Sequence, residues 1–143
     1  MDLQLQNKIV LVSGGAKGIG AAIVGSFAAE GAIPVILDRN PQEAQALLDD
    51  IACGHFFHVE LTDTIQIRKT IDQIHEQVGE VDVLVNNAGV NDGASLEKGP
   101  QAFVSSLEKN LIHPFALAHY LINDLKNNSG NIVNVGSKVA DTG

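Results

Sequence analysis

Several features that would place this chain in a specialised class are scarce or missing from it. Its 143 residues include a single cysteine, Cys53, so no disulfide can form within the chain, and we expect a reducing, cytoplasmic compartment. No positively charged segment precedes an apolar stretch at the N-terminus, and no run approaches the roughly 18 apolar residues of a membrane-spanning helix. We therefore expect neither a secretion signal nor a membrane anchor.

Positive charge is also scarce. Nine Lys and Arg residues stand against 17 Asp and Glu residues, which gives a formal net charge of −8 at pH 7. Without a basic cluster, neither nucleic acid nor an anionic membrane surface is an expected partner. The five histidines do not combine with acids or cysteine at a metal-ligand spacing, so we expect no metal site.

The chain does contain a regular alternation of short apolar runs and segments with helical periodicity. This alternation is typical of a parallel sheet covered by helices, so the expected fold class is α/β with a doubly wound (Rossmann) sheet. We expect a single domain over residues 1–143, incomplete at its C-terminus, with about five strands in the order 3-2-1-4-5. The expected strands lie near residues 8–13, 33–38, 56–61, 81–86 and 131–136.

A glycine-rich turn at residues 13–20, Ser-Gly-Gly-Ala-Lys-Gly-Ile-Gly, joins the first strand to a helical pattern. Glycines at 14, 18 and 20 suit a tight turn that a pyrophosphate can approach closely. The free amides and the positive dipole end of the next helix would then face that anion. Glycine-rich turns join strands to helices in many folds, so this motif alone leaves a purely structural role open.

An acidic residue, Asp38, ends the second expected strand 18 residues after Gly20. Nucleotide-binding units place at this distance the acid that holds the hydroxyls of the adenosine ribose. Because such an acid repels a 2′-phosphate, Asp38 favours NAD over NADP. The neighbouring Arg39 and Lys17 would soften this preference if they faced the ligand, whereas solvated side chains would leave it unchanged.

The segment 101–126 predicts one long helix, bent at Pro114 and ended by the turn at residues 128–130. A helix with an apolar surface this wide usually has a second partner, so we expect a homo-oligomer that forms through this helix. Apolar residues lie off its main stripe at Ile112, Ala116, Tyr120 and Ile122.

Residues 86–89, Asn-Asn-Ala-Gly, follow the expected fourth strand about 70 residues after the glycine turn. Together the two motifs resemble the short-chain dehydrogenase/reductase family. Asn110 resembles the family's helix asparagine, and residues 132–137 resemble the strand that ends in its catalytic serine, here Ser137. The resemblance covers essentially the whole chain. The segments that look most like the bacterial L-fucose dehydrogenase subgroup are 91–93, 106–113 and 136–138.

The resemblance implies NAD as the cofactor. The family usually has Asp where Glu60 stands, so an alternative interpretation of Glu60 is a solvated residue at the end of a strand. For Asn87, the alternative is a structural role as a brace between adjacent strands. By resemblance, the pyrophosphate lies at Gly14, Gly18, Ile19 and Gly20, the adenosine ribose at Asp38, the adenine at Glu60 and Leu61, and the rest of the cofactor along Asn87, Ala88 and Gly89, with Ser13 and Lys17 completing the first motif.

The implied activity is hydride transfer between nicotinamide and a secondary alcohol of a sugar or polyol, with L-fucose as a candidate. Ser137 would hydrogen-bond the substrate oxygen, and Asn110 would hold a proton-relay water. Alternatively, Ser137 is a plain hydroxyl at the end of a strand, and Asn110 is a polar helix residue whose side chain bonds to the backbone. Pro114 lacks the N–H that would bond the carbonyl of Asn110, so it either keeps that carbonyl available to water or only bends the helix.

One part of the family pattern, Tyr-x-x-x-Lys, is not found in this sequence. The single tyrosine, Tyr120, precedes Ser137 and is followed four residues later by Asp124 rather than lysine, so we expect it to pack rather than to act as a base. We expect a chain that is truncated at its C-terminus relative to the family and inactive by itself. The alternative function is that of a non-catalytic dinucleotide-binding or assembly module.

Overall fold

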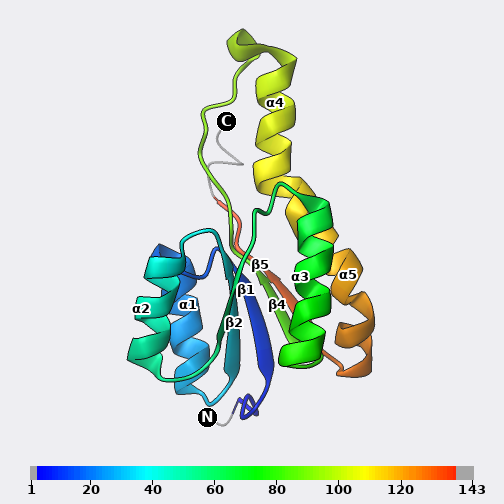
Figure 1. Cartoon of the computed structure of the whole chain (residues 1–143). Helices are drawn as coiled ribbons and strands as arrows, with labels where there is room; N and C mark the ends of the chain where they lie inside the picture. The colour runs from blue at the N-terminus through cyan, green and yellow to red at the C-terminus, as the bar shows by residue number, and fades with distance from the viewer. Residues whose placement is uncertain (1–2, 138–143) are drawn as a thin grey trace.

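The computed structural model describes residues 3–137, and Figure 1 shows a parallel sheet with helices on both of its faces. The strand order is β3-β2-β1-β4-β5, and every neighbouring pair is parallel. This arrangement confirms the predicted α/β class and strand order. The strands are β1 (Ile9–Ser13), β2 (Ile33–Asp38), β3 (His55–His58), β4 (Val83–Asn86) and β5 (Asn131–Asn134).

The two faces of the sheet carry separate apolar cores. Successive side chains of a strand point to opposite faces, so Leu11 faces α3 (Thr64–Gln77) and α5 (His113–Asn127), while Val10 and Val12 face the other pair of helices. That pair is α1 (Gly18–Ala29) and α2 (Pro41–Ile51), which lie together to the left of the sheet in Figure 1. Burial on both faces explains why these strands read as continuous apolar runs.

β3, β4 and β5 are each two residues shorter than the sequence predicts. β3 ends at His58, and β4 begins only at Val83. The extra apolar residues are nevertheless buried: Val59 and Val81 are each at most 1% exposed. Their amides bond to the Asp38 carbonyl at 3.1 Å and to Asp124 Oδ2 at 2.9 Å, respectively. Burial next to a strand therefore gives the same sequence signal as the strand itself.

The predicted single bent helix over residues 101–126 is instead two helices joined by a wider turn. A short 3₁₀ turn, η1 (Leu96–Lys98), leads into α4 (Gly99–Leu107), and the π-helical turn η2 (Glu108–Ile112) connects α4 to α5. A π turn accommodates Pro114, which has no N–H for an α-helical bond. Within residues 3–137, no helix is long and apolar enough to cross a membrane.

A buried carboxylate attaches α5 to the rest of the domain. Asp124 is 5% exposed, and its Oδ2 lies 2.7 Å from His75 Nε2 on α3. The same oxygen accepts a hydrogen bond from the Val81 amide, just before β4. One side chain thus joins two helices and the sheet, which fixes α5 relative to the strands.

Candidate functional site

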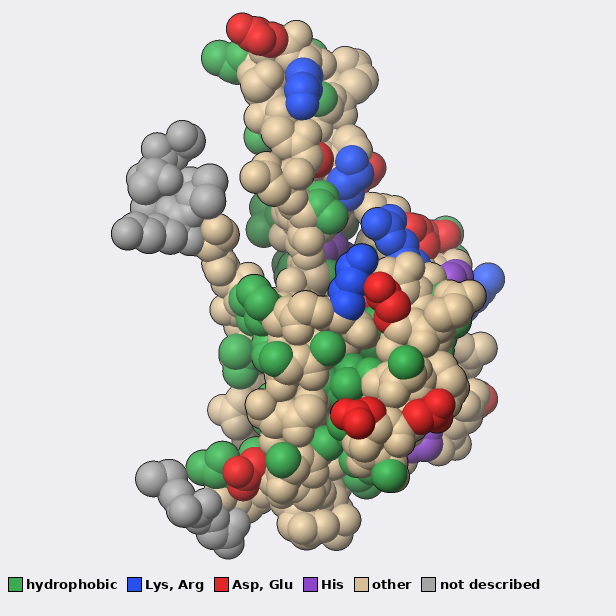
Figure 2. Space-filling model, turned by 90° about the vertical axis from the view of Figure 1, so that its left-hand side faces the viewer, with side chains coloured by type: hydrophobic (Ala, Val, Ile, Leu, Met, Phe, Trp, Pro, Cys, Tyr) green, Lys and Arg blue, Asp and Glu red, His purple; other side chains and the backbone are tan. Residues whose placement is uncertain are grey.

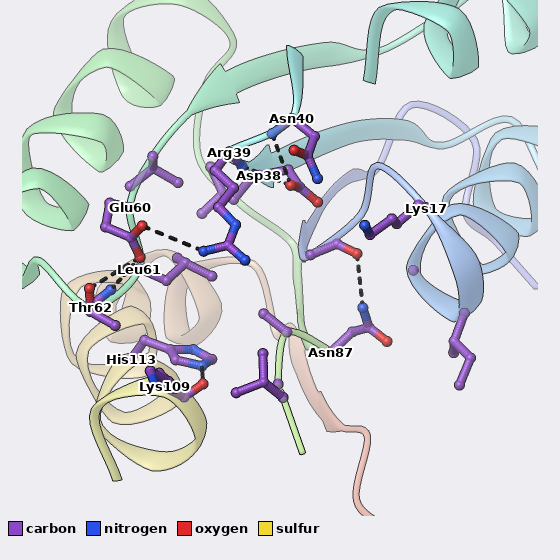
Figure 3. Close-up of a pocket in the computed structure, with 18 of the residues that line it drawn as sticks. Lys17, Asp38, Arg39, Asn40, Glu60, Leu61, Thr62, Asn87, Lys109 and His113 are labelled. Atoms are coloured by element: carbon purple, nitrogen blue, oxygen red, sulfur yellow. Dashed lines mark hydrogen bonds and ion pairs between the residues drawn. The ribbon is translucent and has the colours of Figure 1, made fainter. Parts of the chain in front are cut away.

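A cleft of about 740 Å³ lies at the carboxyl edge of the sheet, where the loops after β1, β2, β3 and β4 meet. The strand order reverses direction between β1 and β4, and ligands of doubly wound sheets bind at such a switch point. The start of α5 closes one side of the cleft (Figure 3). Of the residues predicted to bind the cofactor, all except Ser13 and Gly18 line the cleft: Gly14, Lys17, Ile19, Gly20, Asp38, Glu60, Leu61, Asn87, Ala88 and Gly89.

The glycine turn is shaped by close backbone contacts. Gly14 has φ +64°, and a Cβ on it would lie 3.0 Å from the Cα of Ala88. A Cβ on Gly20 would lie only 2.0 Å from the carbonyl oxygen of Gly14. Gly18 is different, because its φ of +57° favours glycine although a Cβ there would have no atom within 4 Å. Glycine is therefore required for space at residue 20 and for conformation at residue 18.

The first turn of α1 suits an anion. Lys17 stands at the N-cap with an extended backbone and makes no side-chain capping bond, and the first turn contains no acidic residue. The first amides of a helix have no partner within the helix, and the dipole makes that end positive, so these groups are suited to a phosphate. Figure 2 shows Lys and Arg side chains beside the hollow below the projecting α4. Those that line the cleft are Lys17, Arg39 and Lys109.

The carboxylate of Asp38 is held at the cleft by three backbone amides. Oδ2 accepts from Ala16 N at 3.1 Å, and Oδ1 accepts from Arg39 N at 2.7 Å and from Asn40 N at 3.1 Å. Two carboxylate oxygens offer about four acceptor positions, so capacity remains for a ligand hydroxyl. The Arg39 guanidinium lies between Asp38 and Glu60 in Figure 3, with Nη1 4.0 Å from Glu60 Oε2.

Ser13 and Asn87 brace the glycine turn against the loop after β4. Ser13 is fully buried, and its Oγ accepts hydrogen bonds from the Asn87 and Ala88 amides at 3.1 Å each. Asn87 Nδ2 donates to the Ser13 carbonyl at 3.1 Å and to the Gly14 carbonyl at 3.0 Å. Ser13 therefore lies behind the cleft wall, whereas Asn87 both braces the strands and lines the cleft.

Glu60 closes the turn that precedes α3. Its Oε1 accepts from Thr62 N at 3.3 Å and from Thr62 Oγ1 at 3.1 Å, and its own amide donates to Gln66 Oε1. Leu61 is partly buried against the core that α3 and α5 share. This end of the cleft therefore presents an apolar side chain beside a carboxylate whose Oε1 is already hydrogen-bonded to Thr62.

The structure does not bring Asn110 and Ser137 into the main cleft. Asn110 lies in η2, where its Oδ1 accepts from Val90 N at 2.8 Å and its Nδ2 donates to the Ser106 carbonyl at 3.0 Å. It lines a second cavity of about 400 Å³, which shares Ala88 with the main cleft. Ser137 is exposed, three residues beyond β5. The side chain of Asn110 thus has the backbone-bonding role that the sequence left open.

Sequence reasoning missed a polar cluster at the rim of the cleft. Asp92 Oδ1 accepts from Ser106 Oγ at 3.1 Å, and Asp92 Oδ2 lies 3.6 Å from Lys109 Nζ. Desolvation acts to raise the pKa of Asp92, but the Ser106 bond, a bond from the Ala94 amide and the charge of Lys109 together lower it below the ordinary 3.8. The cluster ties the loop after β4 to α4 and η2.

His113, the first residue of α5, also lines the cleft and was not predicted to do so. It is 1% exposed, and its Nε2 lies 2.9 Å from the Lys109 carbonyl oxygen. Burial lowers the pKa of its imidazole. The only available signal was the four-residue spacing from Lys109, which is one helical turn and is common in any helix. In the part of the chain that the structure describes, no group of three or more His, Cys, Asp or Glu residues is arranged to hold a metal.

A sequence profile described as "short chain dehydrogenase" matches residues 8–143. The L-fucose dehydrogenase of Mus musculus is 33% identical over 138 residues, which cover 95% of this chain and 50% of that protein. The 3-oxoacyl-[acyl-carrier-protein] reductase of Escherichia coli is 33% identical over 144 residues, which cover 99% of this chain and 59% of that protein. The chain thus spans about half the length of the curated relatives it matches.

Solved structures match the whole of the described fold. The Cj0485 dehydrogenase is 36% identical with a TM-score of 0.93, and the match covers 100% of this chain and 56% of that one. L-Sorbose reductase from Gluconobacter frateurii, solved with NADPH and L-sorbose, is 23% identical with a TM-score of 0.89 and covers 99% of this chain and 57% of that one. The second likeness concerns the fold alone.

Proposed function

We propose, because this chain belongs to the short-chain dehydrogenase family, that its cleft binds NAD for hydride transfer between the nicotinamide and a secondary alcohol of a sugar or similar polyol. Bound NAD supplies the hydride acceptor. The observation that carries the proposal is the meeting of the glycine turn, Asp38 and residues 87–89 around one cleft at the strand-order switch. Residues 1–143 then form one NAD-binding domain.

The residues around the cleft fit a dinucleotide. The amides of residues 18–20 suit a diphosphate because no side chain caps α1. The missing Cβ at Gly20 lets the backbone of Gly14 pack against the start of this helix. Asp38 would hold the adenosine ribose, Glu60 and Leu61 would flank the adenine, and residues 87–89 would lie along the nicotinamide half. Lys17, at the N-cap of α1, adds positive charge beside the diphosphate, and Ser13 supports this wall from behind.

The choice of NAD over NADP follows from the charge of Asp38. A 2′-phosphate on the ribose would lie within a few ångströms of this carboxylate, and like charges that close cost on the order of 1 kcal/mol or more. Arg39 offsets this repulsion only in part, since its side chain is 67% exposed and its guanidinium lies toward Glu60. NAD is therefore the proposed cofactor.

For the chemistry, we propose that Ser137 hydrogen-bonds the substrate oxygen and that the backbone carbonyl of Asn110 holds a relay water. The π turn at residues 108–112 supports the second role because it interrupts the α-helical bonding pattern at Asn110. Tyr120 is not suited to take the alcohol proton. It packs against the core on α5, with its ring edge-on to His119 at a centroid distance of 5.1 Å.

A sugar or polyol is the proposed substrate class, with L-fucose as the first candidate. The segments 91–93 and 106–113 that resemble the L-fucose dehydrogenase subgroup contain Asp92, Ser106 and Lys109. These side chains form the polar cluster at the rim of the cleft, where a substrate would enter. A rim of carboxylate, hydroxyl and ammonium groups suits a ligand with several hydroxyls.

We also propose that the chain forms a homo-oligomer through α4 and α5. Large apolar side chains remain exposed along α4, α5 and the η2 turn that joins them, which an isolated domain does not favour. They include Phe103 (60% exposed), Leu111 (60%), Phe115 (75%) and Ile122 (39%).

A turnover assay with NAD and L-fucose tests the proposed function. One sample is the chain of residues 1–143, and the other is the same chain extended by a C-terminal segment that carries the family's Tyr-x-x-x-Lys. We expect residues 1–143 to bind NAD without useful turnover, and the extended chain to be faster by about 10²–10⁴-fold, the usual contribution of a positioned acid–base group. An ordinary enzyme rate from residues 1–143 would contradict the assigned roles. NAD binding without turnover in either sample would favour the non-catalytic module.

A further inference from the structure

Two basic side chains lie beside Asp38 in the cleft. The amide of Ala16, one residue before Lys17, donates to Asp38 Oδ2 at 3.1 Å, and the amide of Arg39 donates to Asp38 Oδ1 at 2.7 Å. Figure 3 shows Asp38 between Arg39 and Lys17, and all three residues line the cleft. A 2′-phosphate on a ribose that Asp38 holds would therefore have a lysine and an arginine as neighbours.

Each of these cations is engaged by an acid from another part of the chain. Lys17 Nζ lies 3.9 Å from Oε2 of Glu43, in the first turn of α2, and Arg39 Nη1 lies 4.0 Å from Glu60 Oε2, after β3. Both pairs are exposed and longer than a hydrogen bond, so charge attraction holds them together. The acids thus bias the position of each cation without fixing it.

The two ion pairs affect NAD and NADP differently. The ribose of NAD presents hydroxyls and needs only the acceptor positions that Asp38 offers. A 2′-phosphate must approach the charge of Asp38 and also draw a cation away from its acid. Glu43 and Glu60 therefore lower the affinity for a 2′-phosphate, while the hydroxyls of NAD do not compete for the same cations.

We propose that Glu43 and Glu60 determine the choice of NAD over NADP through Lys17 and Arg39, the cations that they engage. This inference rests on the proposed dinucleotide function. Asp38 repels a 2′-phosphate directly, whereas the two glutamates act through the basic side chains. Glu43 is not among the described residues that line the cleft, so Lys17 is its route to the ligand.

The test is calorimetric titration of NAD and NADP into the full chain and its variants, which gives the ratio of the two affinities. Glu43→Gln and Glu60→Gln should each shift this ratio toward NADP by about two- to fivefold, the range expected for an exposed ion pair. Glutamine keeps an oxygen that can accept the bonds from Thr62 to Glu60. A contact of Glu60 with the adenine affects both dinucleotides alike and cancels in the ratio.

Asp49→Asn is the matched control for Glu43→Gln. It removes the same charge from the same helix at an exposed position, where the carboxylate accepts a hydrogen bond from Gln45 at 2.7 Å. We expect this variant to keep the parent ratio.

Two double variants test whether the acids act through the cations. In a Lys17→Gln background, Glu43→Gln should leave the ratio nearly unchanged, and Glu60→Gln should do the same in an Arg39→Gln background. If the acids shift the ratio equally with and without the cations, or if Glu43→Gln shifts it no more than the control, the inference is wrong while the dinucleotide site stands.

The parent chain separates this inference from the proposed function. If the parent binds neither NAD nor NADP, the proposed function itself fails and the inference fails with it. A parent that binds both equally has no preference for the two glutamates to determine, which also overturns the inference.

Discussion

The cleft end of the sheet and the α5–β5 side are built differently. β1 and β4 each have a neighbour on both sides, and all four residues of β4 are buried. Among residues 3–137, β5 pairs only with β4, and all four of its residues are exposed. The cleft is thus completed by contacts within residues 3–137, whereas β5 presents an edge and α5 an apolar surface that other protein surfaces would cover. Binding and assembly should therefore respond to different substitutions.

The largest effect is expected at the cleft, from Gly20→Ala. Its Cβ would lie 2.0 Å from the backbone oxygen of Gly14, so the turn must shift. We expect NAD affinity to fall by at least about tenfold, and stability to fall by about 1–3 kcal/mol as in other overpacked sites. Titration with NAD and urea denaturation measure the two effects.

Gly25→Ala is the matched control on the same helix. No atom lies within 4 Å of its Cβ position. Alanine should stabilise α1 by about 0.5–1 kcal/mol and leave NAD binding unchanged. Equal effects of the two substitutions would mean that the close contact at Gly20 does not shape the site.

The next effect is expected on the α5–β5 side, from Phe115→Glu. This ring is 75% exposed, and a charge there should oppose the approach of a second copy. We expect self-association to weaken by about tenfold or more in sedimentation velocity, with NAD affinity unchanged. Ile65→Glu, at a 68% exposed position on α3, is the control and should associate like the parent. If Phe115→Glu associates as strongly as the parent, the proposed interface lies elsewhere.

The smallest effect is expected at the rim, from Asp92→Asn. The pKa of Asp92 is lowered in the folded protein, so its contribution to stability is present above the unfolded value of 3.8 and is lost as the pH falls through the folded value. Thermal melts should therefore give the variant a slightly lower melting temperature than the parent at pH 7, and this difference should vanish in the acid range. Ser106→Ala should lower the melting temperature by part of the same amount. A difference in melting temperature that stays constant down to pH 3 would contradict the charge-based explanation.

Much of the cleft could be predicted because its determinants are local in sequence. The glycine turn, Asp38 and residues 87–89 each follow an apolar strand, and parallel strands bring such loops to one edge. The strand order followed from the same reasoning, and the structure confirms it. The position of Ser13 behind the wall of the cleft could not be predicted from the sequence. A serine hydroxyl can bond a ligand or a backbone amide equally well, and here it bonds two backbone amides.

The α5 side was harder to predict because its contacts depend on three-dimensional packing. The π turn at residues 108–112 depends on how Pro114 is accommodated, and periodicity alone does not distinguish a bend from a wider turn. Asp92 and His113 owe their positions in the site to packing between the loop after β4, η2 and the start of α5. A polar residue in a loop, such as Asp92, or in a helix pattern, such as His113, gives no sequence signal of such packing.

The most direct test of the central claim is calorimetric titration of NAD and NADP into the full chain and into Asp38→Ala. The account predicts that the parent binds NAD at least about fivefold more tightly than NADP, which corresponds to about 1 kcal/mol, and that the difference narrows in Asp38→Ala. Equal affinity for the two dinucleotides in the parent, or no binding of either, would contradict the assignment of this cleft to NAD.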